Sequence, residues 1–192
     1  MAKVQIFNES IIIDNFFNPE VDDEIHKVLK NQKKDGGVLK SNFGGFQTDT
    51  IINKLICDNL LQKCVKCITD IYNLKTKTKF ELNSLWINKN KKNAFNLPHV
   101  HPHSHFSGVY YLEVSKDYGE IIFFTDASLN QVNFYDFIDS KEFNNSYTIK
   151  PQKGMLIIFP SSLRHMVTPH FEDIERISVS FNIGLSHEKE IK

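Results

Sequence analysis

Beyond about residue 80, the chain consists of short apolar runs of a length that predicts β-strands. Each run is rich in Val, Ile, Phe and Tyr, and turn-forming Gly, Pro, Asn or Asp residues separate one run from the next. Six such runs occur: ELNSLWIN, SGVYYLEV, GEIIFFTD, NSYTIKP, GMLIIFP and RISVSFNIG. Strands of this length and spacing are typical of an all-β sandwich or jelly roll. No long helical period follows residue 80, which disfavours a parallel α/β sheet with helical crossovers.

The part of the chain before residue 80 has helical patterning instead. Residues 18–37 predict a helix, with Asn18 as a possible cap, proline at the first position, acidic residues in the first turn and lysines late. A second helix is predicted from about residue 50 to 72, where apolar residues recur near the helical period. We expect both helices to pack on one sheet of the β-core.

Length and charge set the broad class of the protein. A chain of 192 residues fits one domain that can bury a substantial core. The 23 basic and 23 acidic residues cancel, so no overall charge favours binding to nucleic acid or to an anionic membrane. The N-terminus has no apolar run long enough for a signal or a membrane span. We therefore expect one cytoplasmic domain over residues 1–192, with a helical part (1–79) and a β-core (80–185), and a homodimer is compatible with it.

Four histidines alternate along one short segment, PHVHPHSHFSG, and they are His99, His101, His103 and His105. In extended chain, residues i and i+2 point to the same side, so an H-x-H pair can present two imidazoles to one ion. Imidazole is the most common protein ligand for Zn, Fe, Cu and Ni. Pro102 leaves a His-rich surface turn as the alternative, but the spacing favours a metal site.

A third ligand is expected from a later segment, KPQKGMLIIFPSSLRHMVTP. Its apolar run predicts a buried strand that ends at Pro160, and His165 follows on a loop or at the start of the next strand. We expect His165 to face inward, although a hydrogen-bonded core histidine would leave the same pattern.

Arg176 stands out because the chain has two arginines and twenty-one lysines. It alternates with Ser178 and Ser180 on one face of a predicted strand. An arginine inside an apolar strand suggests a need for its planar fork, which binds a carboxylate through two hydrogen bonds as lysine cannot. The alternative is an ordinary cross-strand ion pair.

Together these residues resemble the 2-oxoglutarate and iron(II)-dependent dioxygenase superfamily on its prolyl-hydroxylase-like side. The similarity is greatest to a group of short oxygenases of bacteria and bacteriophages, and it spans residues 86–182. It rests on motifs in a fixed order: Trp86-Ile-Asn88, Asn96-Leu-Pro-His99-Val-His101-Pro102, Ser107-Gly-Val-Tyr110-Tyr111-Leu112, Gly119 to Phe123, Pro151 to Pro160, His165, and Arg176 to Asn182.

The resemblance implies a double-stranded β-helix that binds Fe(II) and uses 2-oxoglutarate and O2. It implies that His99, His101 and His165 are the metal ligands. It further implies that Arg176 binds the far carboxylate of 2-oxoglutarate, aided by three other co-substrate-binding residues, Tyr111, Ser178 and Asn88. The implied activity is hydroxylation of a small-molecule or peptide substrate, such as an amino acid, a peptide or a metabolite.

One residue departs from the pattern of the superfamily. The first metal-binding motif there is usually H-x-D or H-x-E, whereas this chain has His101 at the position of the acid. Either the site uses three histidines, or a shifted pair such as His101 with His103 provides the ligands. Three neutral imidazoles would leave the iron site one charge unit more positive than a carboxylate set.

A cupin-type metalloprotein that does not use 2-oxoglutarate is the alternative function. The H-x-H motif and the strand after Pro151 suit a cupin. A cupin usually adds a glutamate shortly after H-x-H, however, and the first acid here is Glu113. The cupin alternative also leaves Arg176 and Ser178 without a role.

Overall fold

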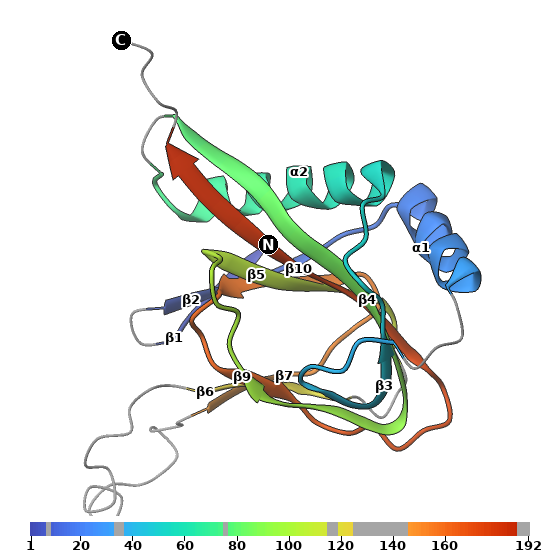
Figure 1. Ribbon diagram of the computed structural model, residues 1–192. Helices are drawn as coiled ribbons and strands as arrows, with labels where there is room; N and C mark the ends of the chain where they lie inside the picture. Colours follow the sequence, from blue (N-terminus) through green and yellow to red (C-terminus); the bar gives the residue numbers. More distant parts are fainter. Residues whose placement is uncertain (7–8, 33–36, 75–76, 115–118, 125–145, 188–192) are drawn as a thin grey trace, which may run out of the picture.

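The computed structural model describes residues 1–6, 9–32, 37–74, 77–114, 119–124 and 146–187 (Figure 1). Two helices and ten strands form in these ranges. In chain order they are β1 (Ala2–Ile6), β2 (Glu9–Asn15), α1 (Pro19–Asn31), β3 (Asn42–Gln47), α2 (Lys54–Ile71), β4 (Thr78–His99), β5 (Phe106–Glu113), β6 (Ile121–Phe124), β7 (Ser146–Ile149), β8 (Met155–Pro160), β9 (His165–Val167) and β10 (Arg176–His187).

Asparagine caps begin both helices. The side chain of Asn18 accepts a hydrogen bond from the backbone N–H of Val21, and Pro19 occupies the first helical position of α1. Asn53 accepts in the same way from Ile56 at the start of α2. Each cap satisfies a backbone donor that has no partner within the helix. Both helices lie within the predicted ranges, although α1 ends at Asn31, and residues 33–36 of its predicted range lie outside the described residues.

The strands form one antiparallel sheet that curls on itself, in the order β1-β2-β8-β5-β10-β4-β9-β6-β7, with β3 paired to β4. The 22-residue strand β4 joins the two halves of this sheet. Its first part pairs with β10, and its last residues pair with β9. Figure 1 shows the result, with the β5–β10 layer on one side of the curl and β6, β7 and β9 on the other.

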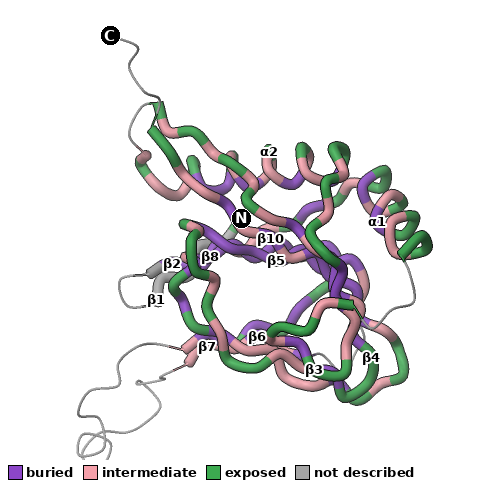
Figure 2. Tube along the Cα trace, in the orientation of Figure 1, coloured by how far each residue is buried: buried purple, intermediate pink, exposed green. Residues whose placement is uncertain are grey.

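Both faces of the β8–β5–β10 layer are buried. One face packs against the helices, through residues such as Tyr110, Phe181 and Ile158 together with Ile56 and Leu60 of α2. The opposite face contributes to a second apolar cluster that includes Val109, Ile157 and Phe159. Figure 2 shows this burial as nearly continuous purple along β5 and β8. Burial on both faces explains why β5 and β8 are mainly apolar. Strand β10 alternates instead, and its polar residues Arg176, Ser178 and Ser180 line a cavity.

The six predicted strand runs are confirmed as β4, β5, β6, β7, β8 and β10. Residues 125–126 and 145, at the ends of two of these runs, lie outside the described residues. The N-terminal part differs from its helical expectation, because β1, β2 and β3 form there as well. These strands are stabilised by pairing with residues distant in sequence, such as Ile12 with Ile158, and local patterning does not reveal such partners. In the described part of the chain, no helix has the length and apolar character needed to cross a membrane.

Candidate metal and co-substrate site

Three histidines from two strand ends meet at one end of the curled sheet. His99 is the last residue of β4 and pairs directly with His165, the first residue of β9. His101 follows β4, and its backbone N–H donates to the carbonyl of Ser161 at 2.9 Å. One nitrogen from each ring lies within 4.8 Å of the other two. The Nε2 atoms of His101 and His165 are 3.3 Å apart.

Backbone carbonyls orient two of these rings. The Nδ1 atom of His99 lies 2.7 Å from the carbonyl oxygen of Leu97, and that of His165 lies 3.0 Å from the carbonyl oxygen of Leu163. A carbonyl only accepts, so each Nδ1 carries the proton and each Nε2 keeps its lone pair. This second hydrogen bond is the usual way in which proteins orient a metal-binding imidazole.

Burial keeps the three imidazoles neutral. It lowers the pKa of His165 to about 3 and that of His101 to about 4, and repulsion among the three rings adds to the shift. The pKa of His99 is lowered as well, again chiefly by burial. The ring of His165 packs against Phe159, with ring centres 4.7 Å apart. Neutral imidazoles with free lone pairs are ready to bind a metal ion at neutral pH.

The other two alternating histidines lie apart from this cluster. His103 is exposed in a turn and has a positive φ of 67°. His105 is exposed too, and its Nδ1 accepts a hydrogen bond from the backbone N–H of Leu185 at 3.0 Å. Pro102 and the turn after it end the alternation. Among the described residues, the histidines that could hold a metal ion are therefore His99, His101 and His165. The shifted pair of His101 with His103 does not come together.

Polar side chains form a wall of the same cavity on the neighbouring strands β4, β10 and β5. Ser178 of β10 lies between Asn88 of β4 and Tyr111 of β5 in the sheet register. Arg176, two residues before Ser178 on β10, is paired with Asn90 of β4. Residues two apart share a face of a strand, so the sheet presents all of these side chains on its inner face. The four residues predicted for co-substrate binding are thereby brought together.

Arg176 is buried, with 3% of its surface exposed, and it forms no ion pair with any residue that the structure describes. Its Nη1 donates one hydrogen bond, to the carbonyl oxygen of Gly119 at 3.0 Å. The alternative, a cross-strand ion pair, is therefore not found in the described part of the chain. Burial lowers the pKa of Arg176, but a guanidinium stays protonated in proteins.

The neighbours of Arg176 are neutral hydrogen-bonding groups. Burial raises the pKa of Tyr111 to about 12, against the opposing effect of the Arg176 charge, so its phenol remains protonated. The Asn88 side chain donates to Ser180 Oγ at 2.9 Å, while its Oδ1 is buried without a described partner. Ser178 is buried beside them. The wall that β4, β5 and β10 form thus contains neutral hydrogen-bonding groups and one cation, but no carboxylate.

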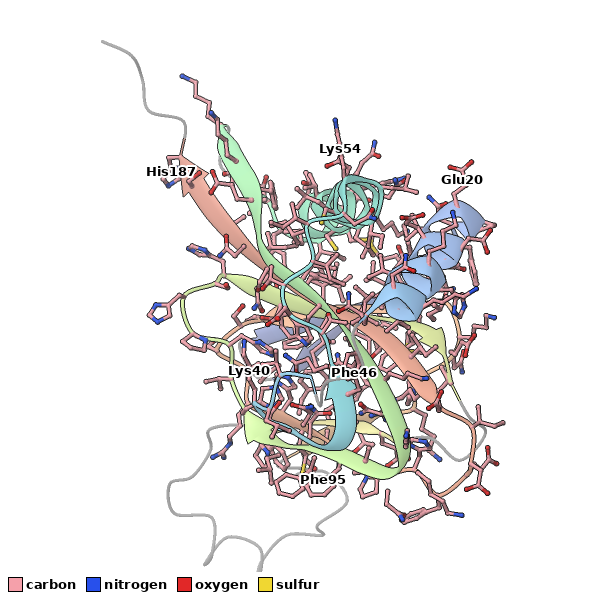
Figure 3. All side chains as sticks on the ribbon, turned by 45° about the vertical axis from the view of Figure 1, so that its right-hand side comes forward. Glu20, Lys40, Phe46, Lys54, Phe95 and His187 are labelled. Carbon is pink, nitrogen blue, oxygen red and sulfur yellow. The ribbon has the colours of Figure 1, made fainter. Side chains whose placement is uncertain are left out.

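A single cavity of about 490 Å³ joins the histidine cluster to the Arg176 wall. Its lining includes the three histidines, Arg176, Ser178, Tyr111 and Asn88. The volume lies within the range of pockets that enclose small molecules. In Figure 3, Lys40 and Phe46 mark the β3 side of the protein, and Lys40 also belongs to the lining.

Three residues near the site have no role predicted from the sequence, although two of them, Asn96 and Gly119, belong to the sequence motifs. Ser41 and Asn96 line the cavity close to His99, and Gly119 holds Arg176 through its carbonyl. Ser41 lies 58 residues before His99 in a segment without a motif, so no sequence signal identifies it. Gly119 belongs to the G-x-x-x-F motif, which could have indicated a close backbone contact.

The sequence matches the model of the family described as "Putative 2OG-Fe(II) oxygenase" over residues 84–182, just over half of the chain. The chain belongs to this family. The oxygenase therefore uses 2-oxoglutarate and Fe(II), as the sequence motifs imply, and the match does not favour the cupin-type alternative. No curated protein sequence matches the chain significantly.

Solved structures share the fold of the oxygenase. A 2OG-Fe(II) oxygenase-family oxidoreductase from Burkholderia pseudomallei superposes with a TM-score of 0.66 at 15% identity, over 91% of this chain and 84% of that one. A prolyl-4-hydroxylase from Pseudomonas putida gives 0.60 at 15% identity, over 91% and 93%. HygX from Streptomyces hygroscopicus, with nickel, 2-oxoglutarate and hygromycin B bound, gives 0.62 at 11% identity, over 91% and 82%. These similarities confirm the double-stranded β-helix.

Proposed function

We propose that the oxygenase hydroxylates a C–H bond of an amino acid, a peptide or a small metabolite. In this proposal His99, His101 and His165 bind Fe(II). Arg176, Tyr111, Ser178 and Asn88 bind 2-oxoglutarate. The hydrogen bonds from the two Nδ1 atoms to carbonyls support the metal assignment, since they direct the Nε2 lone pairs of His99 and His165 toward a common point.

The observation that carries the proposal is a buried arginine without an acidic partner, in the same cavity as three neutral histidines. Removing a charge from water costs several kcal/mol unless a partner compensates it. No described residue supplies that partner for Arg176. A dicarboxylate that reaches from the histidines to Arg176 would supply it, and 2-oxoglutarate is a dicarboxylate of this kind.

With iron and 2-oxoglutarate bound, such a centre couples the decarboxylation of 2-oxoglutarate to succinate with the oxidation of a substrate by O2. The residues of this chain hold and orient the reactants. Arg176 neutralises the far carboxylate, and the Tyr111 phenol and the Ser178 hydroxyl donate hydrogen bonds to it. Apolar residues such as Phe159 and Val109 also line the cavity, and an apolar lining strengthens the polar contacts inside it.

Fold similarity does not select the substrate, since one fold hosts many activities. The similar structures include a prolyl-4-hydroxylase and a complex with hygromycin B. A cavity of about 490 Å³ must hold 2-oxoglutarate together with the reacting part of the substrate. This space suits a small molecule or a single residue of a peptide.

Succinate release tests the proposal directly. The purified protein is incubated with Fe(II), O2 and 2-oxoglutarate, first alone and then with sets of amino acids, peptides and metabolites. We expect slow succinate formation that needs both Fe(II) and O2, and a marked increase with the correct substrate. If the iron-loaded protein neither binds 2-oxoglutarate nor forms succinate, the proposal is wrong.

A further inference from the structure

Ser41 places a hydroxyl group beside the metal-facing nitrogen of His99. Its Oγ lies 3.4 Å from His99 Nε2, and the side chain of Asn96 donates to the same Oγ at 3.2 Å. Ser41 and Asn96 both line the cavity. Neither residue was assigned a role in metal or 2-oxoglutarate binding.

The structure holds Ser41 firmly in this position. Its carbonyl oxygen accepts a hydrogen bond from the backbone N–H of Leu97 at 2.9 Å. The next residue, Asn42, is paired with Asn96 between β3 and β4, and its side chain accepts from the backbone N–H of Lys40 at 3.0 Å. These contacts fix the backbone on both sides of Ser41, and the hydrogen bond from Asn96 holds its hydroxyl.

The hydrogen bonds around Ser41 determine which group accepts the proton of its hydroxyl. Ser41 Oγ accepts from Asn96, so its own O–H remains available to donate. His99 Nδ1 donates to Leu97, so Nε2 carries the lone pair that receives this O–H. A metal ion bound to His99 takes the same lone pair. The Ser41 hydroxyl must then find a new acceptor close by.

We propose that, in the metal-loaded oxygenase, Ser41 donates a hydrogen bond to the oxygen of a small ligand bound at the metal beside His99, and that Asn96 orients the hydroxyl. This inference rests on the proposed function. Dioxygen and water are ligands of the required size and chemistry. A neutral hydroxyl is a weak metal ligand beside three imidazoles, so Ser41 acts on the bound ligand rather than as a fourth protein ligand.

Nitric oxide, a stable substitute for O2 at Fe(II), is the probe. Its affinity for the protein loaded with Fe(II) and 2-oxoglutarate is measured anaerobically from the absorption and paramagnetic resonance of the complex. Ser41→Ala should weaken nitric oxide binding about threefold to tenfold, the effect of losing one hydrogen bond. Ser41→Thr keeps the hydroxyl and should restore the affinity. Asn96→Ala should give a smaller loss, because the hydroxyl remains but is no longer oriented.

Iron affinity and a matched control separate this role from a structural one. Ser162 is an exposed serine three residues from His165, so Ser162→Ala should leave nitric oxide affinity unchanged. Iron affinity should stay within about twofold of wild type in Ser41→Ala. Equal nitric oxide affinity in wild type and Ser41→Ala would overturn the inference, as would a tenfold loss of iron affinity in Ser41→Ala. A wild-type protein that binds no iron would instead overturn the proposed function.

Discussion

At the scale of single residues, the four histidines of segment 99–105 have different environments although they alternate regularly in the sequence. The rings of His99 and His101 face the cavity, whereas His103 and His105 are exposed. The turn at Pro102 causes this difference because it breaks the extended geometry on which the alternation depends. The i and i+2 argument therefore holds for the first pair and fails beyond it.

His165→Ala should abolish tight metal binding, because one of three proposed ligands is lost. His103→Ala is the matched control, since it removes an exposed imidazole from the same histidine-rich segment, outside the cluster. Titration with Co(II) or Fe(II) under anaerobic conditions measures both affinities. Full metal occupancy in His165→Ala would contradict the ligand assignment.

Arg176→Ala should weaken 2-oxoglutarate binding at least tenfold, because charge-assisted hydrogen bonds contribute about 1.5 to 3 kcal/mol each. Arg176→Lys keeps the charge but loses the fork, so its affinity should fall between those of Ala and wild type. Both variants should still bind iron. Arg164→Ala, at the exposed second arginine, is the control. An unchanged 2-oxoglutarate affinity in folded, iron-loaded Arg176→Ala would contradict the assignment.

At the scale of secondary-structure elements, a backbone contact just before β6 holds the arginine of β10. A Cβ atom added to Gly119 would overlap with Nη1 of Arg176 and lie 2.6 Å from the carbonyl oxygen of Thr168. The glycine is therefore required by the close approach of three segments. Sequence motifs indicate such a glycine without indicating which side chain fills the space.

Gly119→Ala should displace Arg176 and weaken 2-oxoglutarate binding, again by about tenfold. Iron binding should persist, because the histidines do not contact Gly119. Gly184→Ala is a suitable control, since the atoms nearest to the added Cβ belong to the side chain of Asn83. Calorimetric titration of 2-oxoglutarate into the iron-loaded variants compares them. An affinity in Gly119→Ala equal to that of wild type would argue against Arg176 as the carboxylate-binding group.

The Asn18 cap of α1 allows a test of the helical layer apart from the site. Asn18→Ala should lower the free energy of unfolding by about 1 kcal/mol, the usual effect of losing an N-cap. Asn18→Asp can still accept from Val21 and should recover most of the loss, apart from the hydrogen bond between Asn18 and Asn59. Urea denaturation measures both variants. Equal stability of Asn18→Ala and wild type would show that the cap contributes little.

At the scale of the whole molecule, the buried histidines connect the site to the stability of the fold. The pKa of His101 is about 4 in the folded protein, whereas a histidine in an unfolded chain has a pKa of about 6.5. Between these values the unfolded state binds a proton that the folded state does not bind. The free energy of unfolding therefore decreases as the pH falls from about 6.5 toward about 4. His165, with a folded pKa of about 3, acts in the same direction.

The metal-free protein should thus be less stable at pH 5 than at pH 7, with about 2 kcal/mol of the loss due to His101 alone. His101→Gln removes this titration and should reduce the loss by a similar amount. The measurement is urea unfolding of both proteins at the two pH values, with a chelator present. The same pH dependence in both proteins would contradict a half-buried, neutral His101.

Local sequence was enough to predict the six strand runs of the second half, both helices and the residue types of the site, because periodicity, caps and H-x-H spacing act over a few residues. Which groups meet depends on the folded chain. The pairing of His99 with His165, the close contact of Gly119 with Arg176 and the position of Ser41 beside His99 all join residues far apart in the chain. Such contacts depend on strand register and on how the sheet curls, and these are set by the packing of the whole core rather than by local sequence.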